Sequence, residues 1–239
     1  MFIIPHQGVC DPHPHVWNGK VWLFTSHDRG PGNPIYRNDD WRLFSSDDLV
    51  NWKLEYTLRP EDTYLGRDEE CYATDGAYRN GKYYFYFSDQ QRSTGVAVSE
   101  NGPAGPYKDA LGKPLLPPWF VDTASYDPTV FIDDDENKTP YILFGYTVIG
   151  KDYYIARLND DMISLAEEPR KIDIVVPELE KQKSVFVPFA LPQVQKKNMK
   201  GDLQFDSKKR PIMVDQSVKI EGGRIQHEFP AYGTLVYRW

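Results

Sequence analysis

Three aspartates occupy the same place in three similar stretches of the chain, and carboxyl groups arranged in this way can exchange protons with a bound molecule. Asp11, Asp75 and Asp127 each open a short apolar strand, which a polar turn joins to an aromatic-rich strand. If the strand starts converge, the like charges raise the pKa of one carboxyl group, so that one holds a proton near neutral pH while another stays ionised. We therefore expect one site with acid–base chemistry.

Two Asn-Gly pairs predict the hairpins that carry the first two aspartates. Asn18-Gly19 and Asn80-Gly81 each separate two apolar runs, and such a pair favours a tight turn because both residues accept a positive φ. A third hairpin is expected from the apolar runs 127–131 and 140–146, which an acidic turn at 133–136 joins. Further strand-like runs follow each hairpin, so that every unit has four predicted strands.

A repeated unit of four strands is typical of a β-propeller blade, whose sheets bury their faces against one another. The sequence predicts an all-β chain with blades one to three in residues 1–175. The first strand of each blade lines the central axis, so the three aspartates would meet at one mouth. After Val175 the pattern stops, and residues 176–239 are expected to form an atypical C-terminal segment, either a remnant blade or a small β-sandwich hairpin. An open sheet edge there would invite pairing with a second copy of the chain, giving a homo-oligomer.

The composition favours a neutral, hydroxyl-rich ligand and argues against nucleic acid. The 239 residues carry a formal net charge of -7 and no basic cluster large enough to neutralise several phosphates. No apolar run approaches the roughly 18 residues of a membrane span, and the apolar start of the chain is too short for a secretory signal. The chain is thus expected to be cytoplasmic, or mature with its leader absent.

Three motifs and two supporting turns stand in an order and spacing that match one enzyme family. The motifs are Asp11-Pro12 with the following turn Asn18-Gly19-Lys20-Val21, Tyr72-Ala73-Thr74-Asp75, and residues 126–135; the supporting turns are residues 46–52 and 159–162. Over about residues 8–175 the chain resembles glycoside hydrolase family 43. The resemblance implies a five-bladed β-propeller acting on arabinose, xylose or galactose linkages. Because no fourth blade can be recognised, the propeller is expected to be shortened or incomplete after the third.

The same resemblance implies roles for the carboxylates. Asp11 would be the general base that activates water, and Asp127 would tune and orient its partner. The family's general acid is a Glu that opens the fourth blade; its usual neighbours are absent here, and Glu180, close to Glu178, is taken as the candidate. An inverting glycosidase holds its two carboxyl groups about 6.5–9.5 Å apart, so that a water fits beside the sugar.

We expect a cofactor-independent hydrolase that removes terminal arabinofuranosyl, xylosyl or galactofuranosyl units from an oligosaccharide with inversion. The alternatives are a non-catalytic sugar-binding propeller and an inactive, truncated glycosidase. The expected contacts to substrate are His13, His27, Asp28, Trp41, Tyr72 and Asp75. The ring of Tyr72 would lie beneath the sugar, although a core tyrosine is nearly as good an interpretation. His13 and His15 suggest a hydrogen-bond network around the sugar in preference to a metal site.

Overall fold

The computed structural model describes Ile4, residues 8–30, 37–66, 70–145 and 152–172, and the backbone of four short strands between residues 193 and 225. The chain divides into two compact units, Met1–Asp173 and Ile174–Trp239. The described residues of the first unit contain strands and one short 3-10 helix, η1 (Pro60–Asp62). The all-β prediction is confirmed.

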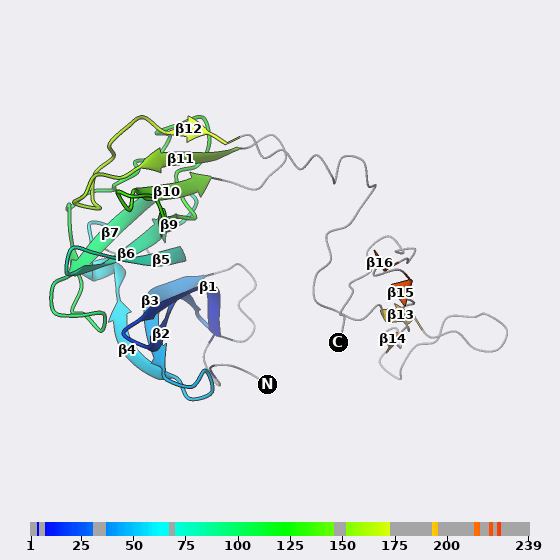
Figure 1. Cartoon of the computed structure of the whole chain (residues 1–239). Helices are drawn as coiled ribbons and strands as arrows, with labels where there is room; N and C mark the ends of the chain where they lie inside the picture. The colour runs from blue at the N-terminus through cyan, green and yellow to red at the C-terminus, as the bar shows by residue number, and fades with distance from the viewer. Residues whose placement is uncertain are drawn as a thin grey trace. The chain divides into compact units, whose positions relative to one another are not determined.

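The first unit contains three antiparallel sheets of four strands, each with its strands paired in chain order (Figure 1). Blade 1 consists of β1 (Gly8–Trp17), β2 (Lys20–Asp28), β3 (Asn38–Ser46) and β4 (Lys53–Leu58). Blade 2 consists of β5 (Cys71–Arg79), β6 (Lys82–Asp89), β7 (Ser93–Ser99) and β8 (Lys108–Asp109). Blade 3 consists of β9 (Thr129–Ile132), β10 (Pro140–Gly145), β11 (Tyr153–Arg157) and β12 (Arg170–Lys171). The fold is therefore of the propeller type.

Tight turns and bulges shape the inner strands in the same way in blades 1 and 2. Both Asn-Gly pairs have positive φ angles, 54° and 75° at Asn18 and Gly19 and 52° and 81° at Asn80 and Gly81, which confirms the predicted hairpins. The register of β1 against β2 shifts between Cys10 and His13, and that of β5 against β6 shifts between Tyr72 and Thr74. A bulge re-aims the side chains next to it. In blade 1 that bulge contains Asp11.

Two hydrophobic cores join neighbouring blades. One combines Phe24, Trp41 and other residues of blade 1 with Phe85 and Phe87 of blade 2. The other combines the opposite face of blade 2 with blade 3. Blades 1 and 2 approach so closely that a Cβ atom built on Gly76 would lie 2.3 Å from the ring of Phe24. Each sheet is thus buried against its neighbour, as a propeller requires.

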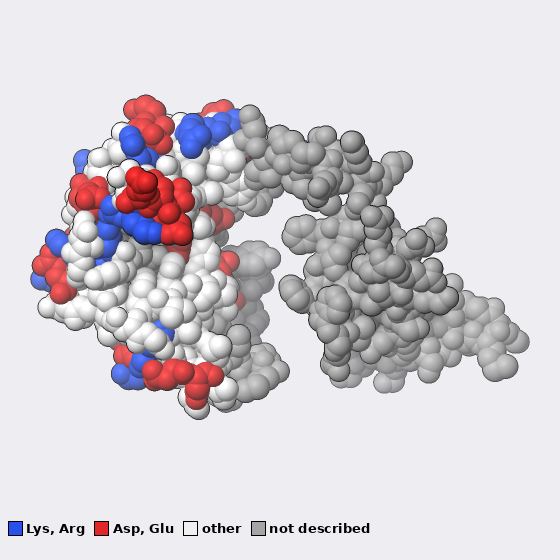
Figure 2. Space-filling model, viewed as in Figure 1, with Lys and Arg blue, Asp and Glu red and all other residues white. Residues whose placement is uncertain are grey.

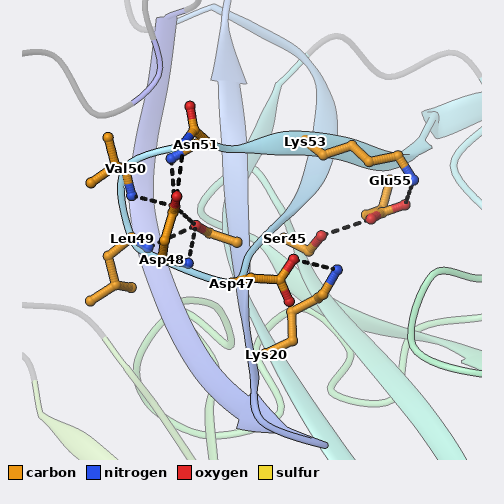
Figure 3. A network of polar contacts seen from close by, with 10 residues as sticks. Lys20, Ser45, Asp47, Asp48, Leu49, Val50, Asn51, Lys53 and Glu55 are labelled. Carbon is orange, nitrogen blue, oxygen red and sulfur yellow. Dashed lines mark hydrogen bonds and ion pairs between the residues drawn. The ribbon is translucent and has the colours of Figure 1, made fainter.

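The polar turn at residues 46–52 of blade 1 has a local structural role (Figure 3). The carboxylate of Asp48 accepts hydrogen bonds from the backbone N–H groups of Val50 and Asn51, and the Ser46 hydroxyl accepts one from Leu49. In blade 3 the Asp161 carboxylate accepts the N–H of Ile163 in the same manner. Side-chain acceptors of this kind fix turns. These supporting motifs therefore mark the strand connections rather than the site.

Acidic and basic side chains lie next to each other on the described part of the surface (Figure 2). Several form ion pairs, among them Lys82 with Glu100 and Arg79 with Asp160. The described residues include no helix of the length and apolar character needed to cross a membrane.

In the second unit the described backbone forms two separate two-stranded pairs. Strand β13 (Gln193–Gln195) pairs with β14 (Met213–Asp215), and β15 (Ile220–Glu221) pairs with β16 (Arg224–Ile225). The predicted boundary at residue 175 and the choice between a remnant blade and a sandwich hairpin stay predictions.

Candidate active site

Asp11 and Asp127 share an unusual backbone conformation. Their φ angles are 48° and 53°, and each is followed by a proline. Non-glycine residues seldom adopt positive φ, and the surrounding structure must hold them there at a cost of about 1–3 kcal/mol. Asp11 lies in the bulge of β1, and Asp127 lies two residues before β9 begins. Backbone strain of this kind gathers at functional sites, and these two are the only aspartates among the nine non-glycine residues with positive φ in the described part of the chain.

Two serines at matching positions support the aspartates. The Ser26 hydroxyl donates to Asp11 Oδ2 over 2.9 Å, and the Ser88 hydroxyl accepts the backbone N–H of Asp127 over 3.0 Å. Ser26 pairs with Cys10 across blade 1, and Ser88 pairs with Tyr72 across blade 2, in each case beside the bulge. Sequence reasoning missed both serines, although their equivalent places near the ends of β2 and β6 were a readable signal.

The electrostatics of Asp127 place it close to Asp11 and His13. Burial, as the larger cause, and the negative charge of Asp11 together raise the pKa of Asp127 to about 7, and His13 acts in the opposite direction. The carboxylate of Asp127 also contributes, after burial, to a raised pKa of Tyr153, which sequence reasoning did not single out. Two neighbouring carboxyl groups of this kind can differ in protonation near neutral pH, one keeping its proton while the other stays ionised.

Asp75 occupies a different position from the one expected, and the predicted sugar contact is wrong. Its side chain is only 3% exposed. Oδ1 accepts hydrogen bonds from His15 Nε2 (2.6 Å) and the backbone N–H of Gly76 (2.7 Å), and Oδ2 accepts one from the N–H of Val130 (2.7 Å). His13 Nδ1 lies 3.2 Å from Oδ1. Because the carboxylate is buried and both of its oxygens accept hydrogen bonds from the protein, a sugar hydroxyl cannot reach it.

The prediction that Trp41 borders the pocket is also wrong. Its side chain is 0% exposed, and the centroid of its ring lies 4.7 Å from that of Phe87. Its indole N–H donates to the carbonyl of Tyr72 over 2.7 Å. Trp41 therefore fills the core between blades 1 and 2. Tyr72 itself is partly exposed, and its predicted stacking beneath a sugar stays a prediction.

The remaining predicted contacts are less closely tied to the aspartate pair. His27 Nδ1 lies 3.0 Å from Asp40 Oδ1, so this ring is directed toward β3. Asp28 ends β2 and pairs with Gly8. Roles for His27 and Asp28 in substrate binding stay predictions. Glu180, the candidate general acid, lies outside the described residues.

No metal centre is evident among the residues that the structure describes, where no three His, Cys, Asp or Glu side chains are grouped so as to hold an ion. In the acidic turn before β10, Asp135 accepts hydrogen bonds from the N–H and hydroxyl groups of Thr139. Neither Cys10 nor Cys71 forms a disulfide bond.

Comparison with known proteins identifies consistent relatives. A family model described as glycosyl hydrolases family 43 matches residues 9–187. The chain is 30% identical to a xylosidase/arabinosidase of Bacteroides ovatus, covering 73% of this chain and 62% of that protein. It is 31% identical to xylosidase/arabinosidase 43A of Humicola insolens, covering 74% and 64%. The chain thus spans less than two thirds of the length of these relatives.

Solved structures agree with these matches. A GH43_1 enzyme from Xanthomonas citri, complexed with xylose, is 26% identical with a TM-score of 0.58, covering 71% of this chain and 56% of that one. A GH43 β-xylosidase/α-arabinofuranosidase from a compost microbial metagenome, in complex with xylotriose, is 27% identical with a TM-score of 0.57, covering 71% and 60%.

Proposed function

Because the chain belongs to glycosyl hydrolases family 43, we propose that it hydrolyses glycosides, removing a terminal arabinofuranosyl, xylosyl or galactofuranosyl unit with inversion at the anomeric carbon. The observation that carries the proposal is the pair formed by Asp11 and Asp127. Both have positive φ, Asp11 in the bulge of β1 and Asp127 two residues before β9, and the pKa of Asp127 is raised to about 7 by burial and by the charge of Asp11.

In this mechanism Asp11 is the general base. Its carboxylate is exposed and held by the Ser26 hydroxyl, so it can accept a proton from a water that attacks the anomeric carbon. Asp127 is largely buried beside it and tunes the charge of the site. Glu180 is the proposed general acid, which would protonate the leaving oxygen.

The choice of sugar is supported by the relatives. Two of them are called xylosidase/arabinosidases, and a third, 29% identical, is called β-D-galactofuranosidase xynD, from Aspergillus niger. The neighbouring structures hold xylose and xylotriose. An oligosaccharide bearing pentose or galactofuranose ends is therefore the proposed substrate.

The test is hydrolysis of aryl α-L-arabinofuranoside, β-D-xyloside and β-D-galactofuranoside, with proton NMR of the sugar first released. We expect turnover of at least one, an inverted anomer, and a loss in kcat/KM of about 100-fold or more in Asp11→Asn and Asp127→Asn. Glu136→Gln, in an exposed turn, is the matched control and should keep full activity. No turnover together with measurable binding of xylotriose would instead support a sugar-binding propeller.

A further inference from the structure

One buried carboxylate contacts the chain segments that carry Asp11 and Asp127 and itself belongs to the inner strand of blade 2. Resting on the proposed function, we propose that Asp75 is a positioning residue that sets the separation of Asp11 and Asp127 by tying the inner strands of blades 1 and 3 to that of blade 2.

The Oδ1 side of Asp75 holds the strand that carries Asp11. His13 and His15 follow Asp11 by two and four residues on β1, and the alternation of a strand puts both on one face. Their rings lie 3.2 Å and 2.6 Å from Asp75 Oδ1. The ring of His15 is further fixed by stacking on Trp17, with centroids 5.2 Å apart. Asp75 therefore anchors β1 immediately after the bulge that contains Asp11.

The Oδ2 side holds the segment that carries Asp127. The N–H of Val130, three residues after Asp127, donates to Oδ2 over 2.7 Å. At the other end of this short segment, the N–H of Asp127 donates to Ser88 Oγ of β6. Both anchors belong to blade 2, so the backbone of Asp127 is held from two sides.

An ionised carboxylate is required for this task because both of its oxygens act only as acceptors. An asparagine of the same size offers one acceptor oxygen, and its NH2 group would face either the Val130 N–H or the Gly76 N–H, donor against donor. Burial alone would raise the pKa of Asp75, but the contacts of His13 and His15 hold it below its ordinary value. A buried charge of this kind persists only when it is paired and hydrogen-bonded.

His13 links the charge of Asp75 to the protonation of Asp127. Three carboxylates act on His13: that of Asp75, which lies on β5, that of Asp11, which lies on the same strand as His13, and that of Asp127, which precedes β9. The contact with Asp75 is the largest cause of the raised pKa of His13, and the charges of Asp11 and Asp127 add to it. The protonated ring in turn favours the ionised form of Asp127. Loss of Asp75 should therefore move the backbone and remove this positive charge together.

The test compares Asp75→Asn and His13→Gln with Asp109→Asn. Asp109 is a matched control in blade 2, since its carboxylate also accepts backbone N–H groups, here three, from Tyr64, Leu111 and Gly112. In Asp75→Asn we expect kcat on an aryl glycoside to fall about 10- to 100-fold with little change in KM, because a displaced catalytic group costs rate rather than binding. In both Asp75→Asn and His13→Gln, the limb of the pH profile set by Asp127 should move to higher pH. Asp109→Asn should keep the wild-type profile.

Two measurements need no activity and so separate this proposal from the proposed function. Titration of labelled histidines by NMR, with the His13 signal assigned from His13→Gln, should show a lower His13 midpoint in Asp75→Asn. Hydrogen exchange should show lost protection of the Val130 amide in the same variant. Unchanged values for both, or wild-type kcat and pH profile in Asp75→Asn, would overturn the positioning role.

A wild type that hydrolyses none of the glycosides would refute the function alone, and the two measurements would still decide the role of Asp75. If Asp75→Asn does not fold, the His13→Gln variant decides the question, because the His13 side chain is 34% exposed in the wild type and its replacement should be tolerated. An unmoved pH profile and an unchanged Asp127 titration in this variant would overturn the proposal.

Discussion

At the scale of single residues, the protonation of Asp127 couples the site to the stability of the fold. Its folded-state pKa is about 7 against an ordinary value of 3.8, with burial as the larger cause and Asp11 as the second. Between these two values the unfolded chain releases a proton that the folded chain keeps. Stability contributed by this group is therefore fully present below about pH 4 and is lost as the pH rises to 7.

Asp127→Asn should remove this loss, because an amide does not titrate. Relative to wild type, the free energy of unfolding of the variant should increase progressively from pH 4 to pH 7 and then stay level. Urea unfolding at four pH values across this range measures it. Glu136→Gln, which removes one exposed carboxylate, is expected to follow the wild-type curve. A difference between Asp127→Asn and wild type that does not change with pH would show that Asp127 is not protonated in the folded protein.

The hydrogen bond to Asp11 gives a second residue-scale prediction. Ser26→Ala removes the hydroxyl that donates to Oδ2, and the loss of one such bond is worth about 0.5–1.5 kcal/mol. We expect kcat/KM on an aryl glycoside to fall about 3- to 10-fold, because the base is less well oriented. Ser164→Ala removes a comparable hydroxyl–carboxylate contact, with Asp161 in an exposed turn of blade 3, and should leave the kinetics unchanged. Equal effects of the two substitutions would count against an orienting role.

At the scale of strands and blades, the close approach of β5 to β2 depends on a residue without a side chain. Gly76→Ala would place a Cβ atom 2.3 Å from the ring of Phe24, which is fully buried. Overpacking of this kind costs about 1–3 kcal/mol. Thermal or urea unfolding of Gly76→Ala, Phe24→Leu and the double variant forms a cycle that tests the contact. Because the smaller Phe24→Leu side chain makes room, the double variant should be more stable than the sum of the single effects predicts, and strict additivity would contradict the close contact.

What the sequence could predict at this scale follows from how local each signal is. The Asn-Gly turns were predictable because the positive φ angles of Asn18 and Asn80 depend only on the residues of the turn itself. The order of strands within a blade follows from such hairpins. The role of Asp75 was not predictable in this way, since its partners His15 and Val130 stand 60 and 55 residues away in the chain.

Trp41 also shows that contacts between distant strands decide where a side chain lies. Its place at the start of a strand-like run suggested a position near the mouth, but the face on which a strand's side chain lies is set by the register against its neighbours. Trp41 pairs with Ser26 of β2, and its ring enters the core shared with blade 2. Repeated placement selected Asp75 together with Asp11 and Asp127, and the serines next to the latter two became evident only when the strands were aligned.

At the scale of the whole unit Met1–Asp173, blade 2 takes part in both hydrophobic cores. Polar contacts reinforce its junction with blade 3. The buried Tyr86 hydroxyl donates to the carbonyl of Met162 over 2.7 Å, and Arg79 Nε donates to Asp160 over 3.0 Å. A sheet that buries its faces only against neighbours gains its stability from them. The three blades should therefore unfold together.

Tyr86→Phe tests this cooperativity with a change confined to the junction of blades 2 and 3. The substitution keeps the ring and removes its hydroxyl, which leaves the buried Met162 carbonyl unpaired at a cost of about 1–3 kcal/mol. Tryptophan fluorescence reports mainly on blade 1, which contains Trp17, Trp22, Trp41 and Trp52, whereas far-UV circular dichroism reports on all strands. If the blades unfold as one, both signals should shift to a lower urea midpoint by the same amount, because a two-state transition looks alike to every probe. The prediction would be contradicted by a fluorescence midpoint that stays at the wild-type value while the dichroism midpoint falls. Blade 1 would then be stable without blade 3, and the contact of Asp75 with the strand of Asp11 would not depend on blade 3.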